Sequence, residues 1–340
     1  MPARILPRRL AAATAVCGLV AGCGGATEAP APPRPQLAFP PKAFEPATAP
    51  ARTGKLPGRV VDVGPKPEGV AVDARTGTVA VALDDPPALV LLDAGTGAER
   101  ARVKLPGGAR HVTLARPGGP FLVPIEDEDV IVEVGLPGGD TRVTPAGDNP
   151  HGVTFADGDI YSGDEFGSTI SVLRGGRRVR QVPVDVQPGG LVVVGDEIAI
   201  VSVRANTIEL FDRRTLRGGG SQNVGYGPSH AVADAAGRVY VADTRGGAIS
   251  VFETKPRLKF VGRTELGGSP YGIAIDTRRA RLWVTLTGRN ELVELTAAAT
   301  PERRRSFPTV AQPNTVGVDE GTGRLYVASR SDGTLQIIGP

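Results

Sequence analysis

The chain has 340 residues, of which 40% are hydrophobic and only 4% aromatic, with 46 Gly and 31 Pro. This composition excludes a wholly disordered chain and suits an all-β protein with many tight turns. The net charge of +3 arises from three arginines in the first 22 residues, and the rest of the chain carries 36 basic and 36 acidic side chains. Such a balance argues against a broad nucleic-acid-binding surface, which requires an excess of Lys and Arg.

Residues 1–22 have the layout of a secretory signal peptide, because three arginines precede an apolar run from Leu10 to Ala21. The run is too short to span a membrane as a helix. The segment Val20-Ala21-Gly22-Cys23 resembles the lipobox of bacterial lipoproteins. That resemblance implies cleavage before Cys23 and a diacylglycerol on its sulfur. We therefore expect a lipoprotein anchored at the cell membrane and facing the extracytoplasmic side, with an ordinary signal peptide as the alternative.

Residues 23–57 are expected to form the lipidated Cys23 and a tether. Nine prolines occur between Gly24 and Pro57, with little hydrophobic periodicity. This predicts a disordered, partly polyproline-like segment. At ~3.1 Å per residue it could reach on the order of 100 Å from the bilayer. Phe39 and Phe44 could instead dock onto the folded body.

Residues 58–340 contain a phrase that recurs seven times, with a turn residue, then one or two polar or Gly positions, then alternating small apolar residues. The copies begin at Pro67, Ala109, Pro150, Pro188, Pro228, Pro270 and Pro313. Their spacing of 38 to 43 residues is the period of a four-stranded propeller blade. The expected fold is therefore all-β, a seven-bladed β-propeller.

Each copy is expected to begin the inner strand of a blade. In the fifth copy, period-two alternation and Gly-rich turns predict strands at 230–233, 238–243, 248–253 and 258–266. The seventh copy has no fourth strand of its own. We expect the N-terminal segment 58–64 to pair with 335–338, to complete the last blade and to close the ring. Six blades with a stray strand is the alternative.

A family resemblance runs along the repeats and is strongest in blades five to seven. The segments Gly323-Arg324-Leu325-Tyr326-Val327-Ala328 and Gly237-Arg238-Val239-Tyr240-Val241-Ala242 resemble the YVTN-type blade of bacterial extracytoplasmic propellers, the YncE-like group. The likeness spans about residues 58–340 and implies a seven-bladed fold. It implies little about function, because the activity of a propeller lies in its loops.

All three histidines of the chain lie in the repeated phrase, which should ring the mouth of the central channel. His111 and His230 occupy the position that is Gly in four other copies, and His151 lies one position earlier. An imidazole in a Gly position breaks the local packing rule, which often marks function. The carboxylates expected beside these histidines are Glu68, Asp164 and Glu165. The residues expected on the rim are Arg110, Arg204, Asp243, Tyr271 and Asn314.

Three histidines with carboxylates could bind Zn²⁺ or another divalent metal ion. The segment Pro150-His151-Gly152-Val153 also resembles the blade start of NHL-type propellers, a group that includes metal-dependent lyases with His at the channel mouth. Blades two, three and five are unevenly spaced around the ring, however, so the imidazoles could instead bond separate loop carbonyls. The acidic run 126–129 is expected to be a solvated hairpin tip.

The expected function is that of a binding module. The channel-mouth face would bind an unknown protein or small-molecule ligand without catalysis, and the protein would act as a monomer. The alternative is a metal-dependent lyase or lactonase that uses the histidines and carboxylates of the mouth. Binding of single-stranded nucleic acid is a further alternative, which the low aromatic content disfavours. No catalytic motif of high specificity occurs, so catalytic residues remain unassigned.

Overall fold

The computed structural model describes residues 45–52 and 54–339. The predicted signal peptide, Cys23 and the tether as far as residue 44 lie outside the described residues. In the part described, no helix is long and apolar enough to cross a membrane.

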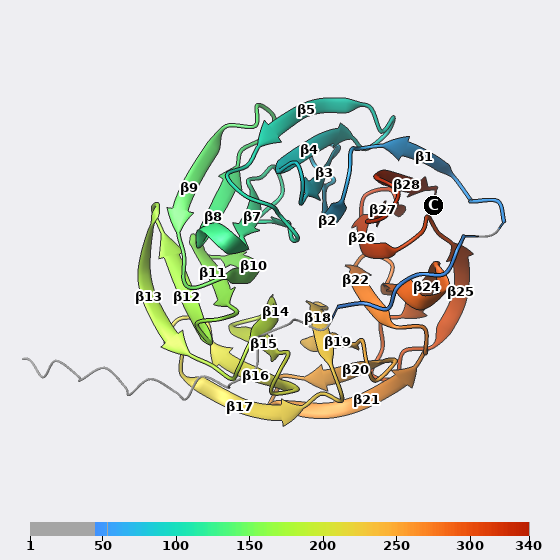
Figure 1. Cartoon of the computed structure of the whole chain (residues 1–340). Helices are drawn as coiled ribbons and strands as arrows, with labels where there is room; N and C mark the ends of the chain where they lie inside the picture. Colours follow the sequence, from blue (N-terminus) through green and yellow to red (C-terminus); the bar gives the residue numbers. More distant parts are fainter. Residues whose placement is uncertain (1–44, 53, 340) are drawn as a thin grey trace, which may run out of the picture. The chain divides into compact units, whose positions relative to one another are not determined.

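The described strands form seven four-stranded antiparallel sheets arranged around a ring, which confirms the seven-bladed β-propeller (Figure 1). The inner strands are β2 (Pro67–Asp73), β6 (Thr113–Leu114), β10 (Pro150–Ala156), β14 (Pro188–Val194), β18 (Pro228–Ala233), β22 (Pro270–Asp276) and β26 (Pro313–Asp319). The second strands are β3 (Thr78–Leu83), β7 (Phe121–Ile125), β11 (Asp159–Asp164), β15 (Glu197–Ser202), β19 (Arg238–Asp243), β23 (Arg281–Leu286) and β27 (Arg324–Ser329).

The third strands are β4 (Ala88–Asp93), β8 (Val130–Val134), β12 (Thr169–Arg174), β16 (Thr207–Asp212), β20 (Ala248–Glu253), β24 (Glu291–Thr296) and β28 (Thr334–Ile338). The outer strands are β5 (Glu99–Lys104), β9 (Thr141–Pro145), β13 (Arg177–Pro183), β17 (Gly218–Asn223), β21 (Lys259–Glu265), β25 (Arg303–Pro308) and β1 (Arg59–Asp62). Two 3₁₀ turns, η1 (Glu126–Glu128) and η2 (Thr287–Arg289), interrupt loops of blades two and six.

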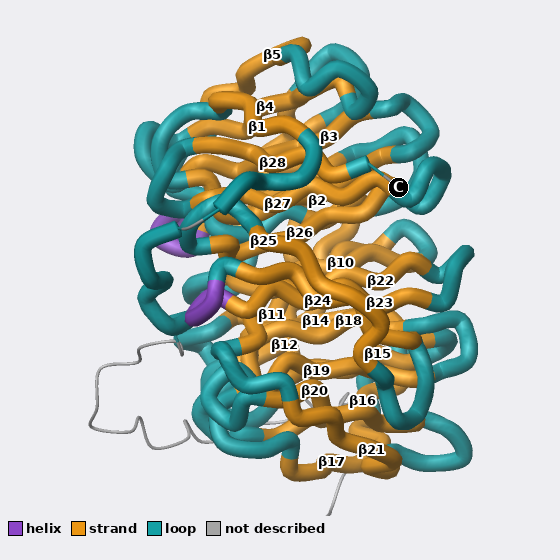
Figure 2. The backbone as a smooth tube through the Cα atoms, turned by 90° about the vertical axis from the view of Figure 1, so that its right-hand side faces the viewer, coloured by secondary structure: helices purple, strands orange, loops and turns teal. Residues whose placement is uncertain are grey.

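The ring closes in blade seven, where the first strand of the described chain joins the last. β1 pairs antiparallel with β28, with Val61 opposite Leu335. The predicted closure by an N-terminal strand thus agrees with the observed sheet order β1-β28-β27-β26. Behind the seam, one apolar cluster joins residues of blades one and seven. The small alternating apolar residues of the repeat thus pack one blade against the next, and the stacked sheets are seen from the side in Figure 2.

The repeated phrase forms a β-bulge at the start of each inner strand except β6. In blade three, for example, Pro150 lies opposite Asp164 and the register then shifts before Val153. The residue before the proline has a positive φ in five blades, as at Asn149 with φ 58°. A bulge turns the side chains of its extra residues out of the regular pleat. The polar positions of the phrase therefore lie at the channel mouth rather than between blades.

Residues 45–52, which we call the N-terminal strap, are hydrogen bonded to the propeller. The backbone N–H of Ala47 donates to Ser269 Oγ at 3.1 Å, and that of Ala49 donates to Gln312 Oε1 at 2.8 Å. Asn290 Nδ2 donates to the carbonyl of Pro50 at 2.8 Å. Figure 1 shows the strap passing over blades six and seven toward the middle of the ring. The tether was predicted to be disordered as far as residue 57. Its residues 45–52 are instead hydrogen bonded to the propeller.

Candidate functional site

The structure brings the three histidines together at the channel mouth. The ring centroids of His111 and His151 lie 4.2 Å apart, and those of His111 and His230 lie 5.3 Å apart. One ring nitrogen from each histidine lies within 4.8 Å of the others. The uneven spacing of blades two, three and five therefore does not separate these side chains, because the bulges of β10 and β18 and the loop before β6 all bring them to the axis.

His151 is held by two carboxylates from neighbouring loops. Its Nδ1 lies 2.9 Å from Glu126 Oε1 and 3.3 Å from Glu165 Oε2. The contact with Glu126 is a close ion pair, but its angle is not that of a hydrogen bond. Burial by itself opposes a charge on His151, but the two carboxylates outweigh it and raise the pKa of the imidazole to about 9. Gln187 Nε2 donates to Glu165 Oε1 at 2.7 Å and fixes that carboxylate.

His111 and His230 have the opposite electrostatic character. Burial lowers the pKa of His230 to about 3, and the nearby charges of His151 and Arg110 act in the same direction. Burial and the same two neighbours also hold the pKa of His111 well below its usual range. His230 Nδ1 lies 3.2 Å from the carbonyl oxygen of Tyr271, whose ring packs edge-on against the imidazole. Both imidazoles are therefore neutral at pH 7.

The donor set fits a transition-metal ion. Nδ1 of His151 faces carboxylates and Nδ1 of His230 faces a carbonyl, which leaves Nε2 of each ring for a ligand. Nε2 of His111 is buried and has no hydrogen-bond partner among the described residues. Metal-binding histidines commonly direct their second nitrogen to a carboxylate or a carbonyl. Nitrogen ligands at about 2.0–2.1 Å from Zn²⁺ lie roughly 3.4 Å apart, so small rotations would complete such a site.

A second group of polar residues lies beside the histidines. Glu68 is buried, with Oε1 at 2.8 Å from Arg330 Nε and Oε2 accepting from Asn314 Nδ2 at 3.0 Å. Arg330 also reaches Asp84 Oδ2 at 2.9 Å. This network joins blades one and seven at the mouth. Each carboxylate oxygen of Glu68 therefore already has a partner, Arg330 for Oε1 and Asn314 for Oε2.

Arg110 lies between this network and the histidines. Its Nη1 is 3.9 Å from Glu126 Oε2, and its Nη2 donates to both carboxylate oxygens of Glu45, at 3.3 and 3.4 Å. Burial opposes the ionisation of Glu126, but the charges of His151 and Arg110 lower its pKa overall. Glu126 thus connects Arg110 with the histidine cluster.

Asp164 and Asp243 do not lie where the sequence analysis placed them. Both carboxylates are fully buried and turn into their own blades. Asp164 accepts from Ser171 and Thr169, each at 2.6 Å, and Asp243 is paired with Arg263 at 2.8 Å. They also accept backbone N–H groups of the loops beside them. These two carboxylates therefore hold the loops in place through hydrogen bonds. Glu165, next to Asp164, is the residue that reaches the mouth.

Sequence reasoning missed Gln187, and it placed Glu126 and Arg330 in loops of the mouth face without assigning them a role at the predicted site. The acidic run 126–129 was expected to be a solvated hairpin tip. Instead η1 turns Glu126 toward His151, while Asp127, Glu128 and Asp129 are exposed. The available signal was the position of the run, since it follows β7 on the same face as the repeated phrase. Arg204, predicted on the rim, is half-buried in the turn after β15.

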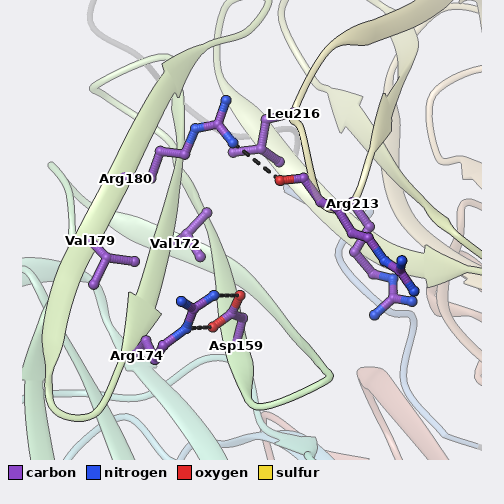
Figure 3. A pocket seen from close by; sticks show the side chains of 8 residues that line it. Asp159, Val172, Arg174, Val179, Arg180, Arg213 and Leu216 are labelled. Atoms are coloured by element: carbon purple, nitrogen blue, oxygen red, sulfur yellow. Dashed lines mark hydrogen bonds and ion pairs between the residues drawn. The ribbon is translucent and has the colours of Figure 1, made fainter.

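A separate pocket of about 300 Å³ lies between blades three and four, and none of the predicted site residues lines it (Figure 3). Three of the four arginines that line it already have partners. Arg174 pairs with Asp159, and Arg180 donates to the backbone carbonyls of Arg214 and Thr215. Arg213 pairs with Asp157 and Asp196. We therefore place the candidate site at the channel mouth.

Comparison with known proteins identifies the fold. No protein-family model matches the chain, and no curated protein matches its sequence. Similar solved structures include hydrazine synthase of Kuenenia stuttgartiensis, with 15% identity and a TM-score of 0.73 over 84% of this chain and 99% of that one. The WD40 repeats of RRP9 match with 10% identity and a TM-score of 0.72, over 84% and 99% of the two chains.

A third similar structure is virginiamycin B lyase from Staphylococcus aureus, with 15% identity and a TM-score of 0.68 over 84% of this chain and 99% of that one. These proteins differ widely in what they do. At such low identity the likeness shows the propeller fold alone.

Proposed function

We propose that this protein is a lipid-anchored, extracytoplasmic propeller of the YVTN type that binds a small ligand at its channel mouth through a divalent metal ion. His111, His151 and His230 would hold the ion, and Glu126 and Glu165 would orient His151. The observation that carries the proposal is the convergence of three ring nitrogens from three blades to within 4.8 Å. A monomer suffices, because one chain supplies every residue of the site.

The proposed ion would leave coordination positions for a ligand, since three histidines do not complete a tetrahedral site. The buried Nε2 of His111 adds support, because a buried polar atom without a partner is costly unless it has a ligand. Packing alone does not explain why this nitrogen is buried without a hydrogen-bond partner among the described residues.

Metal binding to the purified full-length protein tests the proposal. We expect about one equivalent of Zn²⁺ or Co²⁺ per chain by elemental analysis and calorimetric titration. His111→Ala and His230→Ala should each weaken binding by at least roughly 100-fold, because each removes a direct ligand and loss of an outer partner of a ligand already costs roughly 10- to 100-fold. Arg204→Ala, on the same face, is the control and should bind as the wild type does. Absence of a bound equivalent, or binding that survives both histidine changes, would contradict the proposal.

A second candidate function is metal-dependent catalysis of the lyase or lactonase type. It is favoured by the two carboxylates, Glu126 and Glu165, that lie beside the three histidines. The ion would polarise a substrate at its open coordination position, and one of these carboxylates would supply the base. The metal-loaded protein should then turn over a lyase or lactonase substrate, and Glu126→Gln should shift the pH profile of kcat. Failure across such a substrate screen would leave the binding function as the proposal.

A further inference from the structure

Arg110 has an unusual position among the charged residues of the mouth. It follows the loop from blade one and directly precedes His111, and its side chain is only 21% exposed. Among the described residues, its side-chain hydrogen bonds go to Glu45 of the N-terminal strap alone. Tyr271, Glu126 and Glu68 also act on its charge, but Glu126 lies 3.9 Å away and is turned toward His151. The guanidinium fork therefore has no partner from the propeller itself at hydrogen-bond distance.

The contact with Glu45 is weak by its geometry. Both distances, 3.3 and 3.4 Å, are long for a charge-assisted hydrogen bond, and both run from the same nitrogen. The Glu45 side chain is 62% exposed, about three times the exposed fraction of Arg110. Because one partner is largely exposed and the distances are long, this ion pair contributes little to the stability of the fold. Glu45 can therefore be displaced by an incoming carboxylate without disturbing the propeller.

The rest of the strap keeps Glu45 close to Arg110. Ala47 and Ala49 exchange hydrogen bonds with Gln312, whose Nε2 donates to the Ala47 carbonyl at 3.1 Å and whose Oε1 accepts from the Ala49 N–H. These bonds lie on blade seven and do not depend on Arg110. A group tethered in this way has a high effective concentration at its site.

We propose that Arg110 is the residue that binds a carboxylate group of the ligand, and that Glu45 of the strap is a built-in competitor for the same position. The ligand class is therefore a small carboxylic acid, with its carboxylate on the Arg110 fork beside the histidine cluster. This inference rests on the proposed ligand-binding function of the mouth. It adds the chemical class of the ligand and a strap that weakens its binding.

The test is a titration of the full-length protein with succinate, after metal has been removed with a chelating resin. Glu45→Gln should bind succinate about two- to five-fold more tightly than the wild type, because it removes the charge that competes for Arg110. Arg110→Gln should bind succinate at least roughly ten-fold more weakly than the wild type, because it loses a charge-assisted hydrogen bond to the carboxylate. In the double variant, Glu45→Gln should give no further gain. Succinamide, which has no charge, should not bind.

Two further variants keep the result interpretable. Glu302→Gln makes the same chemical change at an exposed glutamate of blade six and should leave succinate affinity unchanged. Arg110→Lys keeps the positive charge but has no forked guanidinium group. An intermediate succinate affinity in this variant would show that the lower affinity of Arg110→Gln does not come from unfolding. Unchanged binding by Arg110→Gln, weaker binding by Glu45→Gln, or no binding by either wild type or Glu45→Gln would overturn the proposal. Because metal is absent throughout, failure of the proposed metal site would not alter these outcomes.

Discussion

Glu126 determines the protonation of the histidine cluster although it belongs to a different blade from His151. Its carboxylate and that of Glu165 keep a positive charge on His151, while burial keeps His111 and His230 neutral. The sequence showed which residue types reach the mouth but not this division of roles. The division depends on a contact between blades two and three that no local pattern encodes.

Metal binding should release a proton from His151. At pH 7 this residue is protonated, with a pKa of about 9, and an ion must displace the proton in order to bind. Zn²⁺ affinity should therefore rise by about tenfold per pH unit from pH 7 to 9. Titration calorimetry in two buffers of different protonation enthalpy measures the released proton.

Glu126→Gln should flatten that pH dependence, because removal of the carboxylate lowers the pKa of His151 toward neutrality. Glu128→Gln, in the same 3₁₀ turn but exposed, is the matched control and should leave the slope unchanged. An unchanged slope in Glu126→Gln would show that this carboxylate does not control the proton.

Strand boundaries were predictable where alternation was regular. The predicted strands at 238–243 and 248–253 coincide with β19 and β20. The inner strand β18 begins two residues earlier than predicted, at Pro228, because the chain pairs with Asp243, bulges, and pairs again at Ala231. The bulge itself, which presents the site residues, has no signature in hydrophobic periodicity.

The seam of the ring depends on a buried glutamine. Gln336 on β28 accepts from the N–H of Val310 at 3.0 Å and donates to the carbonyls of Pro57 and Pro308 at 3.0 and 3.3 Å. It therefore ties β1 and blade six to the last strand. Gln336→Ala should lower the free energy of unfolding by about 2–3 kcal/mol, because it leaves buried backbone groups without partners.

Urea unfolding with a constant m-value measures this loss. Gln222→Ala, at an exposed position on β17, is the control and should change stability by less than about 0.5 kcal/mol. Equal effects of the two substitutions would mean that the seam does not depend on Gln336.

At the scale of the whole molecule, the fold could be predicted from the sequence because its unit repeats. The ligand could not be predicted from the sequence. Seven copies of one phrase specify a ring whatever the loops contain. The chemistry depends on the exceptions to the phrase, such as His111 and His230 in place of Gly, and on the strap that lies over blades six and seven.

Membrane attachment is the prediction that belongs to this scale. Cys23→Ala should move the protein from the membrane fraction to the soluble fraction, because the lipid would have no sulfur to join. Cys17→Ala, within the predicted signal peptide, should leave the membrane fraction unchanged. Fractionation followed by mass measurement of the mature chain distinguishes the two. A Cys23→Ala protein that remains in the membrane fraction would contradict lipid anchoring at this residue.

The pairing of β1 with β28 also constrains the order of events during synthesis. β1 leaves the ribosome before every other described strand, and β28 leaves after all of them. At 5–20 residues per second, β1 waits roughly 15 to 55 seconds for its partner. During that time it is an unpaired strand that could join another chain. Its short length of four residues, with Arg59 and Asp62 at its ends, makes the waiting strand a poor template for aggregation.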